Sequence, residues 1–460
     1  MLEPITLTIV LVFFIIIFLI GVLDRKRVTI DDYFVNSRKT KPWVLVATTA
    51  SSFLGVGALI SNAGVAYSGG GWATLLLVGS FVLYFFIFAR FFAPRIKEFG
   101  DRTKAYTLPD FLEARYDGRT RLAGTLVVLT VYGFFLALQI LGIAVFVSSV
   151  GGIDPRFATL LGGLIVVAYT AIGGMRADIR TDIFQFAVML MLFFVFLPLL
   201  LIKSGGVGAL RSLPPSFLFG GEFAPWYVYV FGFFTIGATN LVSADLWQRA
   251  YAGDSARNVK RAMLVSSIII LLFLVAGTLF GLIGKAVLPP VGENMVVPEL
   301  LRHYLSPALF GVVLAGFFAA IMSTADTVLL IMSMTLVHDV YQKTFKKELS
   351  AERALRVSRM VTAVLGILAV VLALTVFSVV HILIDAVSFS VALLPAIIFG
   401  FYGKHASPRA AFWSIIAGFI AVIIFLFISP VEAFIPGIAA SFLAYFLVRF
   451  FERRNAVPAV

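Results

Sequence analysis

A short polar stretch, residues 319–327, interrupts a long apolar segment of the chain. It contains Ser323, Asp326 and Thr327, whose spacing of i, i+3 and i+4 places them on one face of a helix. Polar side chains are costly in hydrocarbon, so they usually face the interior of a helix bundle or a water-filled path. Hydroxyl and carboxylate oxygens on one face suit an alkali cation that has lost its water. The stretch therefore predicts ion-coupled transport.

The composition indicates an all-α integral membrane protein with a single transmembrane domain over residues 1–460. Hydrophobic residues make up 61% of the chain and charged residues 13%, whereas about 25% of a soluble domain is charged. Runs of about 20 apolar residues, enough to cross a bilayer, recur along the chain. The first run, residues 4–23, is too long for a signal-peptide core, so we expect it to be a retained span. We expect no nucleic-acid partner, because the net charge of +12 fits basic loops held against anionic lipid.

About thirteen apolar segments are long enough to be transmembrane helices. They cover residues 4–23, 42–66, 71–93, 122–150, 154–174, 181–203, 225–248, 261–288, 306–337, 357–378, 381–402, 408–428 and 431–449.

Basic residues gather in alternate loops between these segments. The loops after the odd-numbered segments are rich in Lys and Arg, as in 25–41, 95–121 and 343–359, and the intervening loops carry few charges. The positive-inside rule then places the N-terminus outside the cell and the C-terminus in the cytoplasm. We expect a multi-pass protein of the cell membrane that functions as a monomer in the lipid bilayer.

Two segments contain polar and glycine-rich interruptions at mid-membrane, at residues 47–57 and 237–245. They lie five segments apart, and breaks at matching positions of two halves are typical of transporters built from inverted repeats. The alternative is that the small residues only allow close helix packing. The predicted arrangement is a leading helix (4–23), repeat one (about 42–203), repeat two (about 225–402) and trailing helices (about 408–449).

Five short motifs occur in order along nearly the whole chain. They are Asp32-Tyr33-Phe34 with Ser37-Arg38, Thr107-Leu108-Pro109-Asp110-Phe111-Leu112 with Arg115-Tyr116, residues 169–178 with Thr181-Asp182 and Gln185, Gln248-Arg249, and Ala319 to Thr327. On these motifs the chain resembles the sodium:solute symporter family, whose members share the leucine-transporter-type fold. The resemblance implies two inverted five-helix repeats with broken first core helices, and sodium as the co-transported ion.

The resemblance also implies a sodium site between the first and eighth core helices. Its ligands would be the carbonyls of Ala50, Phe53 and Ala320 and the hydroxyls of Ser323 and Thr324. Unwinding a membrane helix frees carbonyls that an ion can satisfy, which supports this assignment. In the alternative, the two hydroxyls bond back to carbonyls four residues earlier.

Some family members bind a second sodium near the fifth core helix. The matching residues here are Asp182, Ser323, Asp326 and Thr327. Asp182 follows Arg180 at the start of a segment, so it could instead cap a helix or pair in a loop. Asp326 could equally belong to the first site without touching its ion, by positioning the residues that do.

The family places its solute at the membrane midplane between the broken helices. The implied contacts are Gly55, Gly57, Gln139, Thr239, Asn240, Ser243 and Ser388, with Asp385 and Ser390 as further candidates. Gln139 is a lone amide in an apolar span, so it could contact the solute or bond another helix. We expect no Arg or Lys at pocket depth, which disfavours a multiply charged acid. Sugars are also disfavoured, because each unmatched buried polar group costs about 1–3 kcal/mol.

These features predict a sodium-coupled secondary active symporter that imports a small organic solute by alternating access. An amino acid, a monocarboxylate or a vitamin-like acid suits the sequence best. A proton-coupled or uncoupled transporter of the same fold is the alternative, in which Asp182 or Asp326 titrates. We expect no enzyme, because the four histidines are scattered and no metalloprotease-type motif is present.

Overall fold

The computed structural model describes residues 3–22, 30–170, 175–220, 224–345, 351–375, 378–403 and 406–455. The described residues form helices joined by short connections, with one isolated β-bridge between Thr40 and Gly253. Several basic loop residues of the predicted topology, at 25–27, 346–347 and 404–405, lie outside the described residues, as do residues 171–174 of the central motif.

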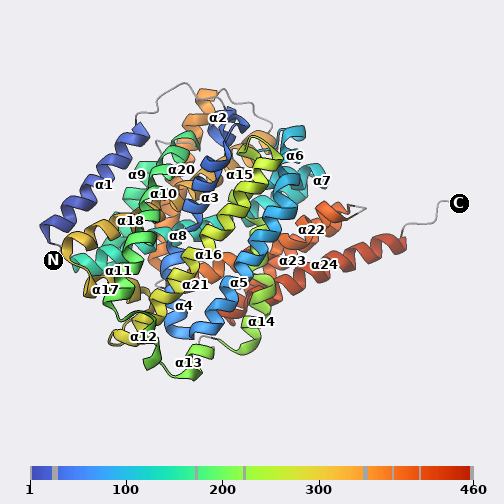
Figure 1. The fold of residues 1–460 in the computed structure, drawn as a ribbon. Coiled ribbons are helices and arrows are strands. Elements are labelled where there is room, and N and C mark those ends of the chain that lie inside the picture. Colours follow the sequence, from blue (N-terminus) through green and yellow to red (C-terminus); the bar gives the residue numbers. More distant parts are fainter. Residues whose placement is uncertain are drawn as a thin grey trace.

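Every predicted apolar segment coincides with one or more helices (Figure 1). In chain order these are α1 (Pro4–Val22), α3 (Pro42–Phe53) with α4 (Asn62–Gly69), α5 (Gly71–Ile87), α8 (Gly118–Gly151), α9 (Pro155–Thr170), α10 (Met175–Met191) with α11 (Leu197–Lys203), α14 (Trp226–Thr235) with α15 (Ala244–Ala252), α16 (Ala256–Val287), α18 (Pro307–Met334), α20 (Ala351–Thr375), α21 (Val379–Ser390) with α22 (Leu394–Tyr402), α23 (Pro408–Leu426) and α24 (Phe434–Asn455).

Within the described residues, nine continuous helices are long and apolar enough to cross a membrane, and two bent helix pairs raise the number to as many as eleven. The protein is therefore a multi-pass membrane protein. Helices α1 and α9 occupy the two remaining predicted segments. The total of thirteen spans stays a prediction.

Both predicted helix breaks are present. The axis bends by 56° between α3 and the helix that runs from Gly57 to Gly69, and it bends by 40° between Trp226–Val242 and α15. The first break falls at residues 54–56, which include Gly55 and precede Gly57, and the second falls at Ser243, whose backbone is extended. Polar and small residues in these stretches disfavour a continuous helix.

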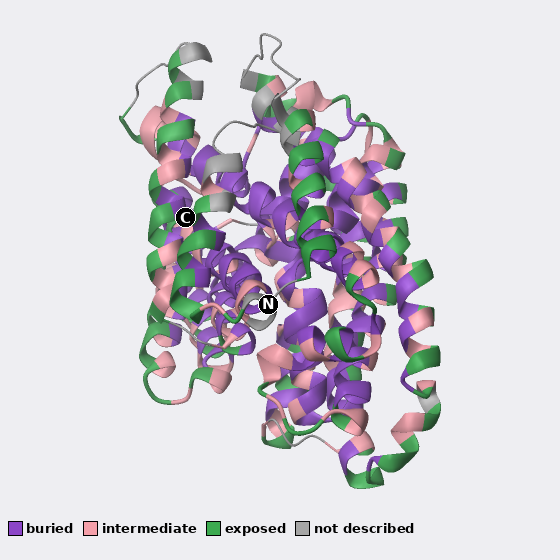
Figure 2. Ribbon diagram, turned by 90° about the vertical axis from the view of Figure 1, so that its left-hand side faces the viewer, coloured by how far each residue is buried: buried purple, intermediate pink, exposed green. Residues whose placement is uncertain are grey.

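The interior of the bundle is formed by α8, α18 and α21, and α18 is buried along almost its whole length from Phe310 to Met334. The outer helices instead expose large apolar side chains, such as Leu11 and Ile15 of α1 and Phe446 and Phe450 of α24. Figure 2 shows this contrast between a buried interior and exposed outer helices. Exposed apolar surface on this scale fits a protein that is surrounded by lipid.

Shorter helices close the ends of the bundle. They include α2 (Ile30–Val35), α6 (Ala93–Thr103), α7 (Leu108–Arg115), α13 (Pro215–Phe219) and α17 (Val296–Tyr304). Helix α7 begins with a capping box, in which Thr107 and Asp110 each bind the other's backbone amide. This helix is held against the π-helical end of α18, residues Thr335–Gln342, by buried polar contacts.

Candidate ion and solute site

The end of α3 meets the middle of α18 at the first predicted sodium site. Oγ1 of Thr324 lies 2.9 Å from the carbonyl oxygen of Ser52 and 3.1 Å from that of Ala320. The last turn of a helix leaves its carbonyls without intrahelical amide partners, so the break after Phe53 makes such oxygens available. The contacts therefore bring together oxygen atoms from both helices, which is what binding of an alkali cation requires.

The predicted ligands of this site differ in their local contacts. Ala50, Ala320 and Ser323 are fully buried, and Phe53 is half-buried. The hydroxyl of Thr324 bonds back to the carbonyl of Ala320, four residues earlier, as the alternative to an ion site predicts. It also contacts the carbonyl of Ser52 on α3. Ser323 instead donates to the carboxylate of Asp182 on α10. The carbonyl of Ser52, which is not one of the predicted ligands, belongs to the same cluster.

Two residues of the predicted second sodium site, Asp182 and Thr327, lie beside the side chain of Arg249. Asp182, Asp326 and Thr327 are all buried, and Thr327 accepts a 2.9 Å hydrogen bond from Nη2 of Arg249. The same nitrogen donates to Oγ of Ser52 and lies 3.9 Å from Oδ2 of Asp182. No Arg or Lys is among the described residues that line the central cavity, as expected, but Arg249 lies directly behind the wall, where it contacts the lining residues Ser52 and Thr327.

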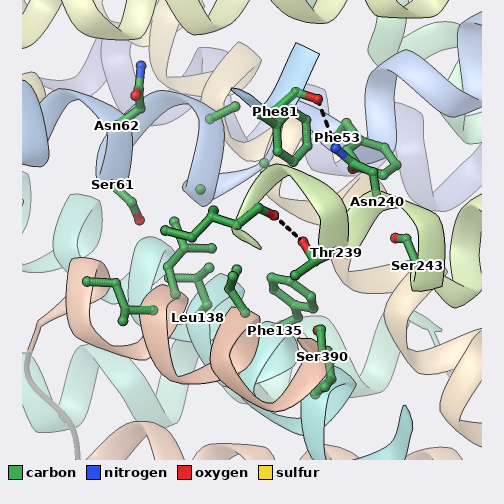
Figure 3. Close-up of a pocket in the computed structure, with 18 of the residues that line it drawn as sticks. Phe53, Ser61, Asn62, Phe81, Phe135, Leu138, Thr239, Asn240, Ser243 and Ser390 are labelled. Carbon is green, nitrogen blue, oxygen red and sulfur yellow. Dashed lines mark hydrogen bonds between the residues drawn. The ribbon is translucent and has the colours of Figure 1, made fainter. Parts of the chain in front are cut away.

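A central cavity of about 260 Å³ lies between the two broken helices (Figure 3). Six of the predicted solute contacts are among its lining residues: Gly55, Gly57, Gln139, Thr239, Asn240 and Ser243. The structure does not bring Ser388 to the cavity, because its buried hydroxyl bonds back to the carbonyl of Ile384, and Ser390 lines the cavity instead. Most of the wall is aromatic and aliphatic, with contributions from Phe53, Phe81, Phe135, Leu138 and Leu383.

The polar side chains of the cavity also hold the broken helices in place. Oε1 of Gln139 accepts a 3.1 Å hydrogen bond from the backbone amide of Val56, inside the first break. Nδ2 of Asn240 donates to the carbonyl of Phe81, as Figure 3 shows, and Thr239 donates to the carbonyl of Ile236. Gln139 therefore makes the helix-to-helix bond that was one of its two predicted roles, and it lines the cavity as well.

Two buried residues of the cavity wall, Tyr132 and Asp245, were not among the predicted contacts. The Asp245 carboxylate accepts hydrogen bonds from the hydroxyls of Tyr132 and Ser243, and its backbone amide donates to the Tyr132 oxygen at 2.8 Å. Asp245 could have been singled out, because an ionisable residue inside a predicted span marks a functional site by default. Nothing in its local sequence pointed to Tyr132, which lies 113 residues earlier.

Comparisons with known proteins agree with this architecture. A model of the sodium:solute symporter family matches residues 33–213 and 218–418. The chain is 26% identical to the high-affinity proline transporter PutP of Bacillus subtilis, over 94% of each chain. It is 28% identical to the sodium/pantothenate symporter of Escherichia coli, over 75% of this chain and 74% of the relative.

Solved structures show the same fold. A substrate-bound, outward-open sodium-coupled sialic acid symporter superposes with a TM-score of 0.82 at 20% identity, over 98% of each chain. MhsT in complex with L-phenylalanine superposes with a TM-score of 0.56 at 14% identity, over 92% of this chain and 100% of that one. The helix breaks and the cavity between them therefore belong to a leucine-transporter-type fold. The chain is a member of the sodium:solute symporter family, a membrane transporter that couples its solute to sodium and not an enzyme.

Proposed function

We propose that this symporter imports a small carboxylate-bearing solute with a compact apolar body, such as an amino acid, together with sodium bound between α3 and α18. One observation carries the proposal: Thr324 lines the central cavity and also contacts the carbonyls of Ser52 and Ala320. Ion and solute would therefore share the same broken helix. A ligand at either position would favour the conformation that binds the other, which is the requirement for coupling.

The proposed sodium ligands are the carbonyls of Ala50, Phe53 and Ala320 and the hydroxyls of Ser323 and Thr324. Ala50 and Phe53 belong to the last turn of α3, and Ala320, Ser323 and Thr324 belong to α18. Neutral oxygen atoms suit a monovalent cation, because they can replace its water without trapping it. The possible second site at Asp182, Asp326 and Thr327 stays a prediction.

The chemistry of the cavity supports the solute class. Its wall is mostly apolar, and several of its polar atoms already bond within the protein, as in Asn240 and Thr239. A sugar would leave many hydroxyls unmatched, at about 1–3 kcal/mol for each buried group. The N-terminus of α15 already carries the carboxylate of Asp245, whereas the helix that begins at Gly57 beside the cavity has no acidic residue in its first turn and favours a negative group on the solute. The named relatives transport proline and pantothenate, which both carry a carboxylate.

The proposed cycle is alternating access by a monomer in the cell membrane, with the N-terminus outside and the C-terminus in the cytoplasm. The moving units are the two repeats, residues 42–203 and 225–402, between the leading helix and the trailing helices. Sodium enters from outside, holds α3 against α18 and so favours solute binding. A membrane potential of 100 mV contributes about 2.3 kcal/mol for each charge that crosses with the solute.

A thermal-shift screen of the purified protein tests this proposal. The protein would be heated in sodium, potassium or choline chloride with a panel of amino acids, monocarboxylates and sugars. We expect sodium alone to raise the unfolding temperature, and one carboxylate-bearing solute to raise it further only when sodium is present. A sodium-independent shift with a sugar would overturn the proposed solute class.

Replacing Ser323 by alanine is expected to raise the sodium concentration for half-maximal uptake about fivefold. The substitution removes one proposed ligand, and a lost hydrogen-bond-like contact costs about 1 kcal/mol. The matched control is Ser333→Ala, which removes another fully buried hydroxyl of α18 that bonds the backbone carbonyl of Ser358. Sodium dependence of uptake should stay unchanged in the control. Equal sodium dependence in both variants would exclude Ser323 from the site.

A further inference from the structure

Asp245 places a carboxylate in the wall of a cavity that is otherwise mostly apolar. It is the one acidic residue among the described residues that line this cavity. Only 8% of Asp245 is exposed, and it is exposed to the cavity that it lines. An ionisable side chain inside a membrane-spanning segment is costly, so it marks a functional position by default.

The two oxygens of this carboxylate have different surroundings. Oδ1 accepts hydrogen bonds from the hydroxyls of Tyr132 and Ser243, and the Tyr132 oxygen accepts a 2.8 Å hydrogen bond from the backbone amide of Asp245. Oδ2 has no hydrogen-bond partner among the described residues, and it is not buried, so it is accessible from the cavity. The contacts of Oδ1 therefore hold the carboxylate in place and leave Oδ2 for a ligand.

No positive group of the protein neutralises Asp245 within the part of the chain that the structure describes. No Lys or Arg there lines the cavity or forms an ion pair with Asp245. Arg249, one turn further along α15, instead contacts Ser52 and Thr327. The hydroxyls of Tyr132 and Ser243 and the N-terminus of α15 stabilise the negative charge. A carboxylate beside apolar walls still favours a cation next to it.

We propose that Oδ2 of Asp245 binds the protonated amino group of the solute, and that Asp245 thereby selects amino acids among the carboxylate-bearing solutes. The inference rests on the proposed function, from which it takes the carboxylate of the solute. A protonated nitrogen is both the cation and the hydrogen-bond donor that Oδ2 lacks.

The position of Asp245 lets one solute contact both broken helices. Asp245 lies in the first turn of α15, directly after the second break, whereas the helix that begins at Gly57 follows the first break. The amino group of a bound amino acid would face Asp245, and its carboxylate would face the N-terminus at Gly57. A solute without the nitrogen would leave Oδ2 buried beneath it without a partner, which is costly.

Matched solutes with and without an amino group test the inference on the unmodified protein. Thermal-shift titrations in sodium chloride would compare the amino acid that binds best with the same molecule without its amino group, such as valine with 3-methylbutanoate or proline with cyclopentanecarboxylate. We expect the amino acid to bind at least about tenfold more tightly. Equal binding within a pair would overturn the inference but leave a carboxylate-bearing solute intact. If no carboxylate-bearing solute bound in sodium, the proposed function would fall, and the inference with it.

A variant separates binding of the nitrogen from a structural role of Asp245. Asp245→Asn keeps an oxygen that can accept from Tyr132 and Ser243 but removes the negative charge. We expect it to weaken binding of the amino acid about 10- to 100-fold and to leave binding of the partner without nitrogen nearly unchanged. The ratio of the two affinities should therefore fall toward one.

The control is Asp254→Asn, which removes an exposed carboxylate just beyond the other end of α15 and should keep the ratio of the unmodified protein. An Asp245→Asn protein that keeps this ratio would contradict the inference, as would one that loses both solutes equally. If Asp245→Asn does not fold, the matched solutes on the unmodified protein still decide.

Discussion

Replacing Gly55 by alanine is expected to reduce sodium-coupled uptake about 10- to 100-fold. A Cβ atom at this position would lie 2.4 Å from Oγ1 of Thr324 and 2.7 Å from Oε1 of Gln139. Overpacking of this kind costs about 1–3 kcal/mol, and each 1.4 kcal/mol changes an equilibrium about tenfold. The added methyl group separates α3 from α18, so the carbonyl and hydroxyl ligands can no longer close around one ion.

The control for this variant is Gly79→Ala in α5, where an added Cβ would meet no atom within 4 Å. Uptake would be measured in proteoliposomes that contain equal amounts of folded protein, across a range of sodium concentrations. Gly79→Ala should match the unmodified protein. Equal uptake by the Gly55→Ala and Gly79→Ala variants would show that close contact between the two helices is not needed.

Replacing Asp110 by asparagine is expected to lower the free energy of unfolding by about 3 kcal/mol, which is typical when one partner of a buried ion pair is removed. The Asp110 carboxylate is buried at the start of α7 and accepts from the backbone amides of Tyr106 and Thr107. It also contacts Nε2 of His338 at 3.1 Å and Nζ of Lys343 at 2.8 Å. Asparagine would keep the shape but leave these two basic groups without their carboxylate.

The pH dependence of this effect follows from the pKa of Asp110. Burial alone would raise that pKa, but the hydrogen bond from His338 and the charges of His338 and Lys343 outweigh burial and lower it. A carboxyl group whose pKa is lower in the folded protein stabilises the fold above its unfolded pKa of about 3.9. The difference between Asp110→Asn and the unmodified protein should therefore be present at pH 5 and shrink in stronger acid, as Asp110 becomes protonated. Part of it should also be lost at higher pH, because the contact with His338 is charged only when the ring is protonated.

Thermal unfolding in detergent at pH 7, with Glu98→Gln as the control, checks this expectation. Glu98 is an exposed carboxylate on the neighbouring helix α6, and its substitution should leave the unfolding temperature nearly unchanged. An Asp110→Asn protein as stable as this control would show that the contacts between α7 and the end of α18 contribute little to the fold.

The helices and their breaks could be predicted from the sequence, because both leave local signals. Each apolar segment is recognisable by its own length and hydropathy. The polar and small residues around Gly55 and Ser243 mark where a helix breaks. The number of spans is harder to predict than their positions, because α1 counts as a shorter apolar helix over Pro4–Ile17 and α9 has only 16 residues, both below the length of the other spans.

The contacts of the site could be predicted only where family motifs assign them. Six of the seven expected solute residues line the cavity. Ser388 does not, because its hydroxyl donates to the carbonyl of Ile384 in its own helix. The sequence does not show whether a serine hydroxyl bonds its own helix or a ligand. Arg249 contacts Ser52 and Thr327, and Ser52 lies 197 positions away from it in the sequence. His338 likewise meets Asp110 across 228 positions. No periodicity encodes such pairs.

Solute uptake driven only by a sodium gradient is the most direct test of sodium-coupled symport at this site. Proteoliposomes would receive the radiolabelled amino acid that the thermal-shift screen identifies, with an inward gradient of sodium, of protons or of neither. We expect the solute to accumulate above its external concentration with a sodium gradient alone, and this accumulation to collapse when the sodium gradient is dissipated. Accumulation that is driven by the proton gradient and does not depend on sodium would contradict sodium coupling and would assign the coupling to a titrating carboxylate such as Asp182 or Asp326.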